Sequence, residues 1–300
     1  MSCSIVIVSF NTRPLTLACL DSVHRSAGVS IQTIVVDNAS EDGSADAIEG
    51  SHPGVRLLRN RENLGFARAV NQGLACATSS VVLLLNSDAI LEEGTVSKLV
   101  EVLEAHSEIG AVGPWVVSPH GALQHHCASR EHSLAGQLLW HFRLSPGKPY
   151  LAEEIGPHGT RRTERLSGAA LAVRRNVIDR VGLLDERFFL YFEDADWVLR
   201  IRRAGFLAGC VTEARVTHAM GASARANPLM RLMRSVHSVR SELAYFEKHH
   251  GPWRTFLLRT GILVSSGLRA VSLDAIRALL PGERYRLVAD LRAIGTCLHP

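Results

Sequence analysis

The chain has 300 residues, of which 46% are hydrophobic and 21% charged, the balance of an ordinary globular protein. This length suits one large domain, or a domain of about 200 residues with an appendage. The six cysteines form no Cys-x-x-Cys pair, which argues against a disulfide framework or a zinc cluster and fits a reducing compartment. No basic stretch precedes the first apolar run, so we expect no secretory signal and a cytoplasmic protein.

Short apolar strands alternate with amphipathic helices over the first 106 residues. This order predicts a doubly wound α/β sheet. No Gly-x-Gly-x-x-Gly or Gly-x4-Gly-Lys-Ser/Thr sequence accompanies the strands, which disfavours a dinucleotide site or a P-loop. The expected strands are Ser4–Ser9, Ile31–Val36, Val55–Leu58 and Val81–Leu85, and the expected helices are Asn11–Ser26, Ser44–Glu49, Gly65–Ala77 and Thr95–His106.

The chain beyond residue 106 is less regular. We expect strands and turns over Ile109–Ala122, a strand or buried turn over Leu166–Val173 and a helix over Asn176–Val181. Residues 130–165 contain Pro-Gly and Gly-Pro pairs, which predicts a long irregular segment of the kind that often forms a binding loop. After Met220 the pattern becomes helical and basic.

Acidic residues follow two of the expected strands. Asp37 comes after the second strand, and Asp88 closes the sequence Asn86-Ser87-Asp88 after the fourth. Ligands of such sheets bind beyond the carboxyl ends of the strands, which is where both acids fall. Taken singly, however, each is more typical of a turn or helix cap than of a ligand. The lone His218 is likewise more typical of a core or surface residue.

Three acids stand among aromatic side chains in the sequence Tyr-Phe-Glu-Asp-Ala-Asp-Trp, residues 191–197. Aromatic surroundings would desolvate a carboxyl group, raise its pKa and make it a usable general base. A helix beginning near Glu193 would also place acids at the positive end of its dipole. Dipole pairing does not explain the crowding of aromatic residues, so we favour a catalytic function for this segment.

Ordered motifs between Ile5 and His218, about three quarters of the chain, together resemble glycosyltransferase family 2, inverting enzymes with the GT-A fold. The spacing of the motifs makes the resemblance specific, although no one of them would be. In this chain they are VSFN (8–11), VDNASEDGS (36–44), NLGFARAVNQG (63–73), NSD (86–88), SGA (167–169) and DERFFLYFEDADWVLR (185–200).

The resemblance implies a Rossmann-like mixed sheet flanked by helices. It places a GT-A catalytic domain over residues 1–222 and a basic amphipathic helical extension over residues 223–300. It also implies a nucleotide-diphosphate sugar donor whose pyrimidine base is recognised by Asp37. The residues that the resemblance assigns to the donor pocket are Ser9, Asn11, Asp37, Asn63, Gly65, Phe66, Asn71, Asn86 and Ser87.

The same resemblance assigns the reacting groups. Asn86-Ser87-Asp88 takes the place of the metal-binding Asp-x-Asp motif with Asn in the first position, which leaves Asp88 as the main carboxylate ligand of Mg²⁺ or Mn²⁺. His218 becomes an additional metal ligand. Asp194, with Glu193 beside it, becomes the catalytic base. The residues expected on the acceptor side are Gly168, Asp196, Trp197 and Arg200.

The Asn-x-Asp form most resembles bacterial rhamnosyltransferases, which implies dTDP-L-rhamnose as donor and a cell-surface glycan or polyprenyl-linked acceptor. The Gln-x-x-Arg-Trp motif of processive synthases is absent, so we expect single additions. A UDP-sugar donor is the alternative, and a catalytically silent nucleotide-sugar or glycan-binding module is a rival of another class. A nucleotidylyltransferase is disfavoured because no Gly-x-Gly-Thr-Arg loop follows the first strand.

The C-terminal stretch is basic, with twelve Lys/Arg against five Asp/Glu after residue 218. Its apolar segment Phe256–Ile276 is interrupted by Arg259, Arg269 and Asp274, which makes it too charged for a membrane span and better suited to an interfacial amphipathic helix. We therefore expect peripheral contact with the inner face of the plasma membrane. A dimer-packing or core helix and a merely solvated basic face are the alternatives, and no nucleic-acid partner is expected.

Overall fold

The computed structural model describes residues 2–25, 28–144, 149–219 and 228–275, which form two compact units. The sheet unit comprises Met1–Glu131, Lys148–Glu186 and Asp194–Ala222. The helical unit comprises His132–Gly147, Arg187–Glu193 and Ser223–Pro300. The boundary expected at residues 222 and 223 falls among residues 220–227, outside the described part, as do residues 276–300 of the expected extension. The helical unit also takes in two internal segments that the sequence pattern assigns to the catalytic domain.

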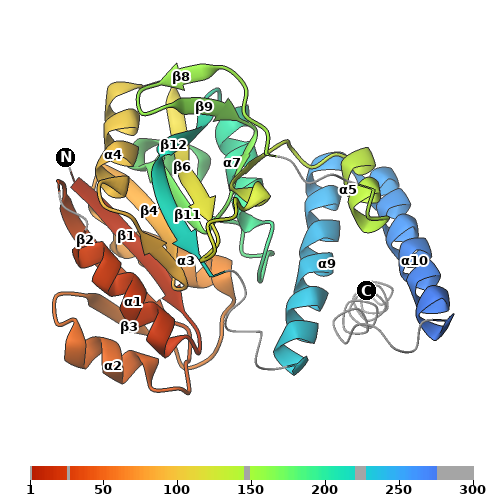
Figure 1. The fold of residues 1–300 in the computed structure, drawn as a ribbon, viewed down its shortest axis with the longest axis horizontal. Helices are drawn as coiled ribbons and strands as arrows, with labels where there is room; N and C mark the ends of the chain where they lie inside the picture. The colour runs from red at the N-terminus through yellow and green to blue at the C-terminus, as the bar shows by residue number, and fades with distance from the viewer. Residues whose placement is uncertain (1, 26–27, 145–148, 220–227, 276–300) are drawn as a thin grey trace. The chain divides into compact units, whose positions relative to one another are not determined.

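Four parallel strands build the first half of the sheet, in the order β3-β2-β1-β4 (Figure 1). The sequences of β1, β2 and β4 are apolar and largely buried on both faces, as parallel strands between layers of helices require, whereas β3 at the sheet edge reads Arg-Leu-Leu-Arg and is partly exposed. In the register, Ser9 lies opposite Asp37 and Val8 lies opposite Asn86, so the strand ends after β2 and β4 flank the end of β1. The bounds are β1 Ser2–Ser9, β2 Ser30–Asp37, β3 Arg56–Arg59 and β4 Val81–Asn86.

The second half of the ten-stranded sheet is mixed, in the order β11-β6-β12-β9-β8 beyond β4. Strand β11 runs antiparallel to both β4 and β6, whereas β12 runs parallel to β6. The short β5 pairs antiparallel with the end of β12 and sets Ala89 opposite His218. The bounds are β5 Ala89–Leu91, β6 Ile109–Val117, β8 Glu154–Gly156, β9 Thr160–Thr163, β11 Ala170–Arg174 and β12 Leu207–His218.

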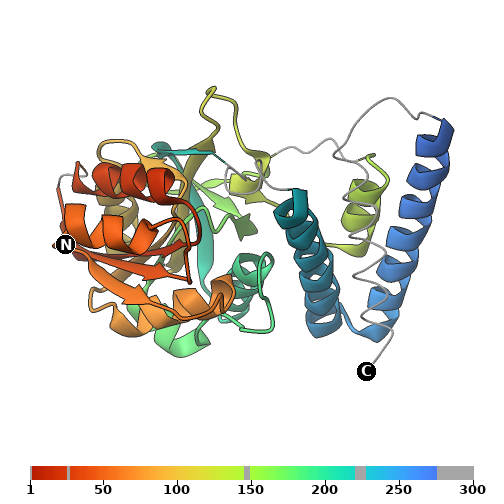
Figure 2. The same cartoon turned by 90° about the horizontal axis from the view of Figure 1, so that it is seen from below.

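Helices cover both faces of this sheet (Figure 2). One core cluster packs α1 and α4 residues such as Leu20 and Leu99 against the strands, and the other packs α3, α6 and α7 residues such as Val70, Ile178 and Trp197. The expected α/β sheet with flanking helices is therefore confirmed. The bounds are α1 Arg13–His24, α2 Ser44–Ser51, α3 Phe66–Cys76, α4 Thr95–Ala105, α6 Arg175–Val181 and α7 Glu193–Arg203.

The segment 130–165, expected to be irregular, contains the helix α5 (Leu134–His141) and the strands β8 and β9. That expectation was wrong because β9 reads Thr-Arg-Arg-Thr and sits toward the edge of the sheet, where an apolar pattern is not needed. The expected strand at Leu166–Val173 is divided into β10 (Arg165–Leu166), which pairs with β7 (Ala128–Ser129), and β11. The turn between β10 and β11 carries Gly168.

The helical unit contains α5, α9 (Pro228–His250) and α10 (Pro252–Ala275). The buried His141 of α5 places Nε2 3.0 Å from both carboxylate oxygens of Glu242 on α9. Helices α5 and α10 approach closely at Gly261, where an added Cβ would lie 2.1 Å from Cδ2 of Leu138. Among the described residues, no helix is long and apolar enough to cross a membrane.

Candidate active site

Asp37 ends β2 with a carboxylate that is only half engaged. Its side chain is 3% exposed, and Oδ1 accepts the Ser40 N–H at 2.9 Å. Oδ2 is buried and has no hydrogen-bond partner among the described residues. An ionised oxygen buried without a donor is costly, because nothing replaces its lost hydration. The end of β2 therefore presents an acceptor that a ligand N–H group would complete.

The loops after β1 and β2 are locked together beside Asp37. The Asn11 N–H donates to Ser40 Oγ at 3.0 Å, and Asn11 Oδ1 accepts the Glu41 N–H at 2.8 Å. Asn11 and Ala39 both have left-handed backbone conformations, with φ of +52° and +67°. Such conformations are unfavourable for residues other than glycine and cluster at functional sites.

Ser9 and Ser87 belong to a buried hydroxyl cluster beneath these loops. Ser9 Oγ lies 3.1 Å from Thr16 Oγ1, and Thr12 Oγ1 lies 3.1 Å from Ser87 Oγ. Ser9 has no exposed surface, so in this structure its side chain fixes the loop rather than facing solvent. The cluster ties the end of β1 to the Asn86-Ser87-Asp88 turn.

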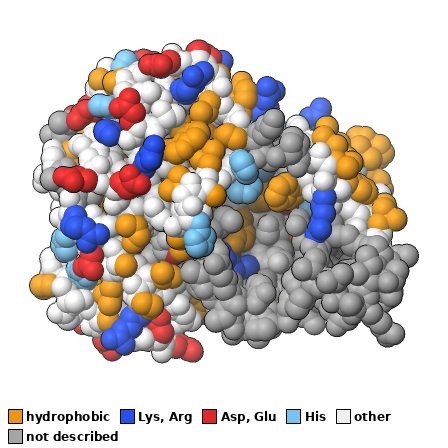
Figure 3. Space-filling model, viewed as in Figure 1, with side chains coloured by type: hydrophobic (Ala, Val, Ile, Leu, Met, Phe, Trp, Pro, Cys, Tyr) orange, Lys and Arg blue, Asp and Glu red, His pale blue; other side chains and the backbone are white. Residues whose placement is uncertain are grey.

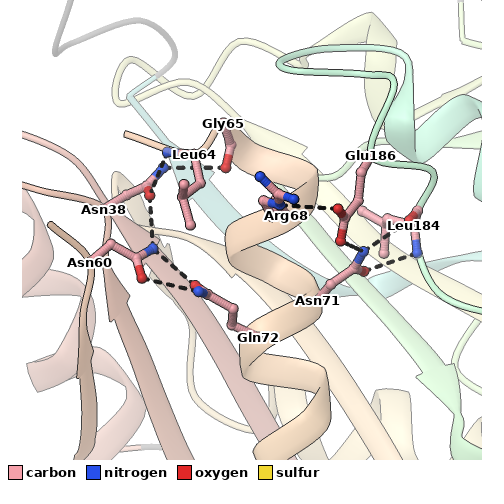
Figure 4. A network of polar contacts seen from close by, with 9 residues as sticks. All are labelled: Asn38, Asn60, Leu64, Gly65, Arg68, Asn71, Gln72, Leu184 and Glu186. Carbon is pink, nitrogen blue, oxygen red and sulfur yellow. Dashed lines mark hydrogen bonds and ion pairs between the residues drawn. The ribbon is translucent and has the colours of Figure 1, made fainter. Parts of the chain in front are cut away.

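A chain of side-chain amides fixes the turn that starts α3 (Figure 4). Asn38 donates to Asn63 Oδ1 at 2.9 Å and to the Gly65 carbonyl at 3.2 Å, and its Oδ1 accepts from Asn60 at 3.0 Å. Asn60 and Gln72 exchange two hydrogen bonds, of 2.9 and 3.1 Å. Sequence reasoning did not single out Asn60 or Gln72, whose only signal was a set of amide residues near the expected turn.

Asn71 and Glu186 join α3 to the loop that follows α6. The Asn71 amide donates to the Leu184 carbonyl at 3.0 Å and to Glu186 Oε1 at 3.1 Å, while its Oδ1 accepts the Leu184 N–H at 3.1 Å. Arg68 adds an ion pair to Glu186 at 3.1 Å (Figure 4). Asn71, expected in the donor pocket, thus uses both ends of its amide to hold this loop.

Asp88 and His218 face each other across the β5–β12 pairing, with Oδ1 and Nε2 3.0 Å apart. Gln124 fixes a hydrogen on one nitrogen of the His218 ring, Nδ1. Its Nε2 donates to the His218 carbonyl at 2.6 Å, so its Oε1 lies 2.9 Å from Nδ1 and requires a hydrogen there. A neutral His218 therefore turns the lone pair of Nε2 toward a carboxylate oxygen. Two acceptors this close need a proton or a cation to bridge them.

This pair fits a divalent cation. Oxygen and imidazole ligands about 2.1 Å from one ion, at right angles, lie about 3.0 Å from each other. Asn86 Nδ2 is 3.4 Å from Nε2 and stands beside the pair. No group of three or more His, Cys, Asp or Glu gathers as a metal cluster in the part of the chain that the structure describes. A cation held here would therefore keep coordination positions for ligands other than these side chains.

Asp194 lies in the first turn of α7, and its carboxylate is fixed by backbone N–H groups. Oδ2 accepts the Gly168 N–H at 2.7 Å, and Oδ1 accepts the Ala195 N–H at 2.7 Å. A Cβ at residue 168 would lie 3.3 Å from Oδ2, so glycine allows this close approach. The neighbouring Ala169 carbonyl accepts the Asn86 N–H at 3.0 Å. The turn that holds Asp194 is therefore bonded to the strand end that leads to Asp88.

The residues expected on the acceptor side of α7 anchor the helix instead of lining a surface. Asp196 and Trp197 have no exposed area. Asp196 pairs with Arg200 at 2.8 Å, and Arg200 donates to the carbonyls of Val181 and Leu183 at 2.6 and 2.7 Å. These contacts attach α7 to the end of α6 and so help to fix the position of Asp194 at the start of α7.

His126 is a neighbour of Asp194 that sequence reasoning missed. The pKa of its ring is lowered because the surrounding protein desolvates it and Arg165 repels the protonated form, while Asp194 opposes the shift. The side chain still has exposed surface. The lowered pKa favours the neutral form of this ring. The run His-His-Cys at residues 125–127 was the available signal.

The turn before α7 belongs to the helical unit and is held by α9. Tyr191 and Phe192 have φ of +70° and +67°. The Ser241 hydroxyl donates to the Leu190 carbonyl at 2.9 Å, and Arg234 Nε donates to the Tyr191 hydroxyl at 2.8 Å. Two consecutive left-handed aromatic residues persist only where their surroundings hold them. Glu193, which begins α7, is 5% exposed.

Sheet order, flanking helices and the acids at the strand ends are those of a GT-A glycosyltransferase. Residues 4–158 match the family described as glycosyl transferase family 2, and the chain belongs to that family. It is 28% identical over 292 residues to the N-acetylglucosaminyl-diphospho-decaprenol L-rhamnosyltransferase of Mycobacterium tuberculosis, a match that covers 88% of this chain and 94% of the relative. The resemblance to family 2 rhamnosyltransferases is thereby confirmed.

Solved structures with this fold include a mannosyltransferase of Pyrobaculum calidifontis in complex with GDP-Man and Mn²⁺. It has a TM-score of 0.57 at 18% identity and covers 98% of this chain and 86% of that one. TarS of S. aureus has a TM-score of 0.53 at 13% identity and covers 99% and 91%. At these identities the likeness establishes the fold.

Proposed function

We propose that this glycosyltransferase transfers one sugar, with inversion, from a pyrimidine nucleotide-diphosphate donor to a glycan or lipid-linked acceptor. The proposal rests on three kinds of group at one edge of the sheet unit: a hydrogen-bond acceptor, a candidate cation site and a fixed carboxylate. Asp37 offers an unpaired acceptor, Asp88 and His218 offer a cation site, and Asp194 offers a fixed carboxylate. The bond between the Asn86 N–H and the Ala169 carbonyl joins the last two.

Asp37 supports a thymidine or uridine donor. Its buried Oδ2 needs a donor, which the N3–H of thymine or uracil would supply; N3 of cytosine carries no hydrogen, and only its exocyclic N4 amino group could donate instead. Asp37 does not distinguish thymine from uracil. The likeness to an L-rhamnosyltransferase favours dTDP-L-rhamnose, and a UDP-sugar is the alternative. Asn11, Asn63, Gly65 and Phe66 are proposed to shape the same pocket.

Asp88 and His218 are proposed to hold Mg²⁺ or Mn²⁺, which would neutralise charge on the leaving diphosphate. Gln124 binds Nδ1 and the carbonyl of His218 and so aims Nε2 at this position. The carboxylate is a ligand suited to Mg²⁺ or Mn²⁺, and the imidazole is the softer ligand of the pair. Asn86 and Ser87 are proposed to line the diphosphate side.

Asp194 is proposed to accept the proton of the acceptor hydroxyl. As that O–H bond breaks, the hydroxyl oxygen forms a bond to the anomeric carbon, and the bond from this carbon to the diphosphate breaks with its electron pair. Attack opposite the leaving group inverts the configuration. The Gly168 N–H holds the carboxylate in place. Glu193, one residue earlier, is the second carboxylate candidate for this role.

The replacement Asp194→Asn tests the base assignment. We expect the transfer rate to fall about 10²- to 10⁴-fold, since general base catalysis contributes on this scale, while binding of the nucleotide donor is unchanged. The measurement is a transfer and donor-hydrolysis assay over a panel of nucleotide sugars with and without Mn²⁺. Asp179→Asn, an exposed acid on α6, is the matched control. Wild-type transfer by a folded Asp194→Asn protein would shift the role to Glu193.

The panel also tests the rival class. A silent nucleotide-sugar or glycan-binding module would bind a donor and neither hydrolyse nor transfer it under any condition. The likeness to a relative that acts on a decaprenol-linked sugar supports a polyprenyl-linked acceptor. With such an acceptor we propose a cytoplasmic enzyme that meets the inner membrane face through its C-terminal helices, with a homodimer as the alternative use of those helices.

A further inference from the structure

Helix α10 turns its more apolar face outward. Over residues 252–268, the buried face mixes two aliphatic residues with hydroxyl side chains. The exposed face carries large apolar residues, with Trp253 68% and Phe256 55% exposed. The buried set is Thr255, Leu258, Ile262, Ser265 and Ser266, and the exposed large apolar set is Trp253, Phe256, Leu257, Leu263, Val264 and Leu268. A surface helix of a globular protein has the opposite arrangement.

These exposed residues form one strip with cationic rims. At about 100° per residue, they occupy an arc of roughly 140° of the helix. Arg254 falls about 40° beyond one edge of the arc and Arg259 about 40° beyond the other. Residues 252–268 contain no Asp or Glu. The strip is therefore apolar along its centre, with the exposed Arg254 beside one edge and the partly exposed Arg259 beside the other.

Helix α5, in the same unit, adds apolar surface. It packs on α10 at Gly261, and its outer residues are aromatic or aliphatic (Figure 3, right, orange). Isolated exposed apolar residues are normal, but several large ones gathered along one helix face mark a binding surface. The exposed apolar residues of α5 and its end are Leu139, Trp140, Phe142 and Leu144.

We propose that the outer strip of α10 lies in the headgroup region of an anionic lipid bilayer, with Arg254 and Arg259 on lipid phosphates. Apolar centres flanked by basic residues, with Trp and Phe present, suit the interface between headgroups and acyl chains. A second copy fits less well, because two strips packed face to face would bring cationic rims together. The inference names the surface behind the proposed membrane contact and rests on that part of the proposed function.

Binding of the full chain to vesicles tests it. Sedimentation is measured with phosphatidylcholine vesicles and with vesicles that also contain phosphatidylglycerol. We expect Trp253→Ser with Phe256→Ser to lower the partition coefficient at least about tenfold, since each buried apolar side chain contributes on this scale. Arg254→Gln with Arg259→Gln should lose about fivefold per arginine on anionic vesicles and little on neutral ones. Met233→Ser, an exposed residue of α9, is the control and should bind like wild type.

Unchanged partitioning of the Trp253→Ser, Phe256→Ser protein would overturn the proposal. So would a wild-type chain that does not bind vesicles but sediments as a dimer that this variant converts to monomers. Leu263→Ser with Leu268→Ser provides a second variant if the first is poorly folded. Donor hydrolysis without membranes should remain at the wild-type rate in every variant, and Asp194→Asn should bind vesicles normally. Failure of the membrane surface is thus separable from failure of the transferase proposal.

Discussion

The ends of β2 and β4 offer a comparison of two acids in equivalent places. Asp37 and the Asn86–Asp88 turn follow apolar parallel strands on either side of β1. After β2, one carboxylate oxygen is buried with no partner among the described residues. After β4, the carboxylate of Asp88 faces Nε2 of His218, whose other ring nitrogen, Nδ1, donates to Gln124. The first arrangement calls for a hydrogen-bond donor and the second for a cation.

The difference arises from long-range pairing and not from the strand ends themselves. The antiparallel pairing of β5 with β12 places His218 beside Asp88, although 130 residues separate them. Among the described residues Asp37 has no such partner for Oδ2; its Oδ1 is bonded within its own loop, and Arg59 of the adjacent β3 acts on it electrostatically. Acids with the same local sequence setting are thus given different surroundings by the rest of the fold.

Replacing Asp88 with Asn should separate the two sites most strongly. Removing the carboxylate from the proposed cation site should lower the transfer rate by roughly two orders of magnitude or more. A bound cation stabilises the charge of the transition state by several kcal/mol. The response to Mn²⁺ should shift to higher concentration. The measurement is transfer rate against Mn²⁺ concentration. An Asp88→Asn protein with the wild-type Mn²⁺ response would place the cation elsewhere.

Replacing Asp37 with Asn should lower the affinity for the nucleotide without changing the Mn²⁺ response. A hydrogen bond to a charged acceptor contributes about 1.5–3 kcal/mol, so affinity for dTDP or UDP should fall roughly 10- to 150-fold while the Mn²⁺ response of the remaining activity is kept. Calorimetric titration with dTDP, UDP and CDP checks this. The preference over CDP should shrink in the variant. Equal preference in both proteins would contradict base recognition by Asp37.

Replacing Gln124 with Leu should give the smallest of these effects. The variant loses the group that fixes the proton on Nδ1 of His218, and loss of such a partner costs about 10- to 100-fold in metal affinity. Gln124→Glu keeps an acceptor toward Nδ1 and should recover most of the affinity. The Mn²⁺ titration used for Asp88 measures both. An unchanged titration for Gln124→Leu would show that His218 is oriented without it.

Local sequence was sufficient for the first half of the fold. Strands such as Val81–Asn86 are apolar throughout and stand between amphipathic helices, so period and length identify them. The strand Thr160–Thr163, which lies next to the edge strand β8, has neither signal. The antiparallel insertion of β11 between β4 and β6 is set by pairing alone.

The residues of the candidate site can be named from the sequence, whereas their contacts cannot. Asp37, Asp88 and Asp194 could be named from motifs, and the helix expected near Glu193 begins there. The hydrogen bond from Gly168 to Asp194 and the Gln124–His218 pair join residues far apart in sequence, which periodicity does not encode. Ser9, Asn71 and Trp197 carry family motifs, yet the structure gives their side chains packing and bracing contacts.

The three-segment composition of the helical unit has a consequence for how this chain can be recombined. Leu190 and Tyr191 belong to that unit and are gripped by Ser241 and Arg234 of α9. A chimera joined at a single point before α9 would replace Ser241 and Arg234. It would keep the turn at residues 190 and 191 to which they are hydrogen-bonded. Transplanting the C-terminal helices of a relative would therefore also require residues 132–147 and 187–193 from the same parent. The helical unit is thus made of three separate chain segments, and all three would have to be exchanged together.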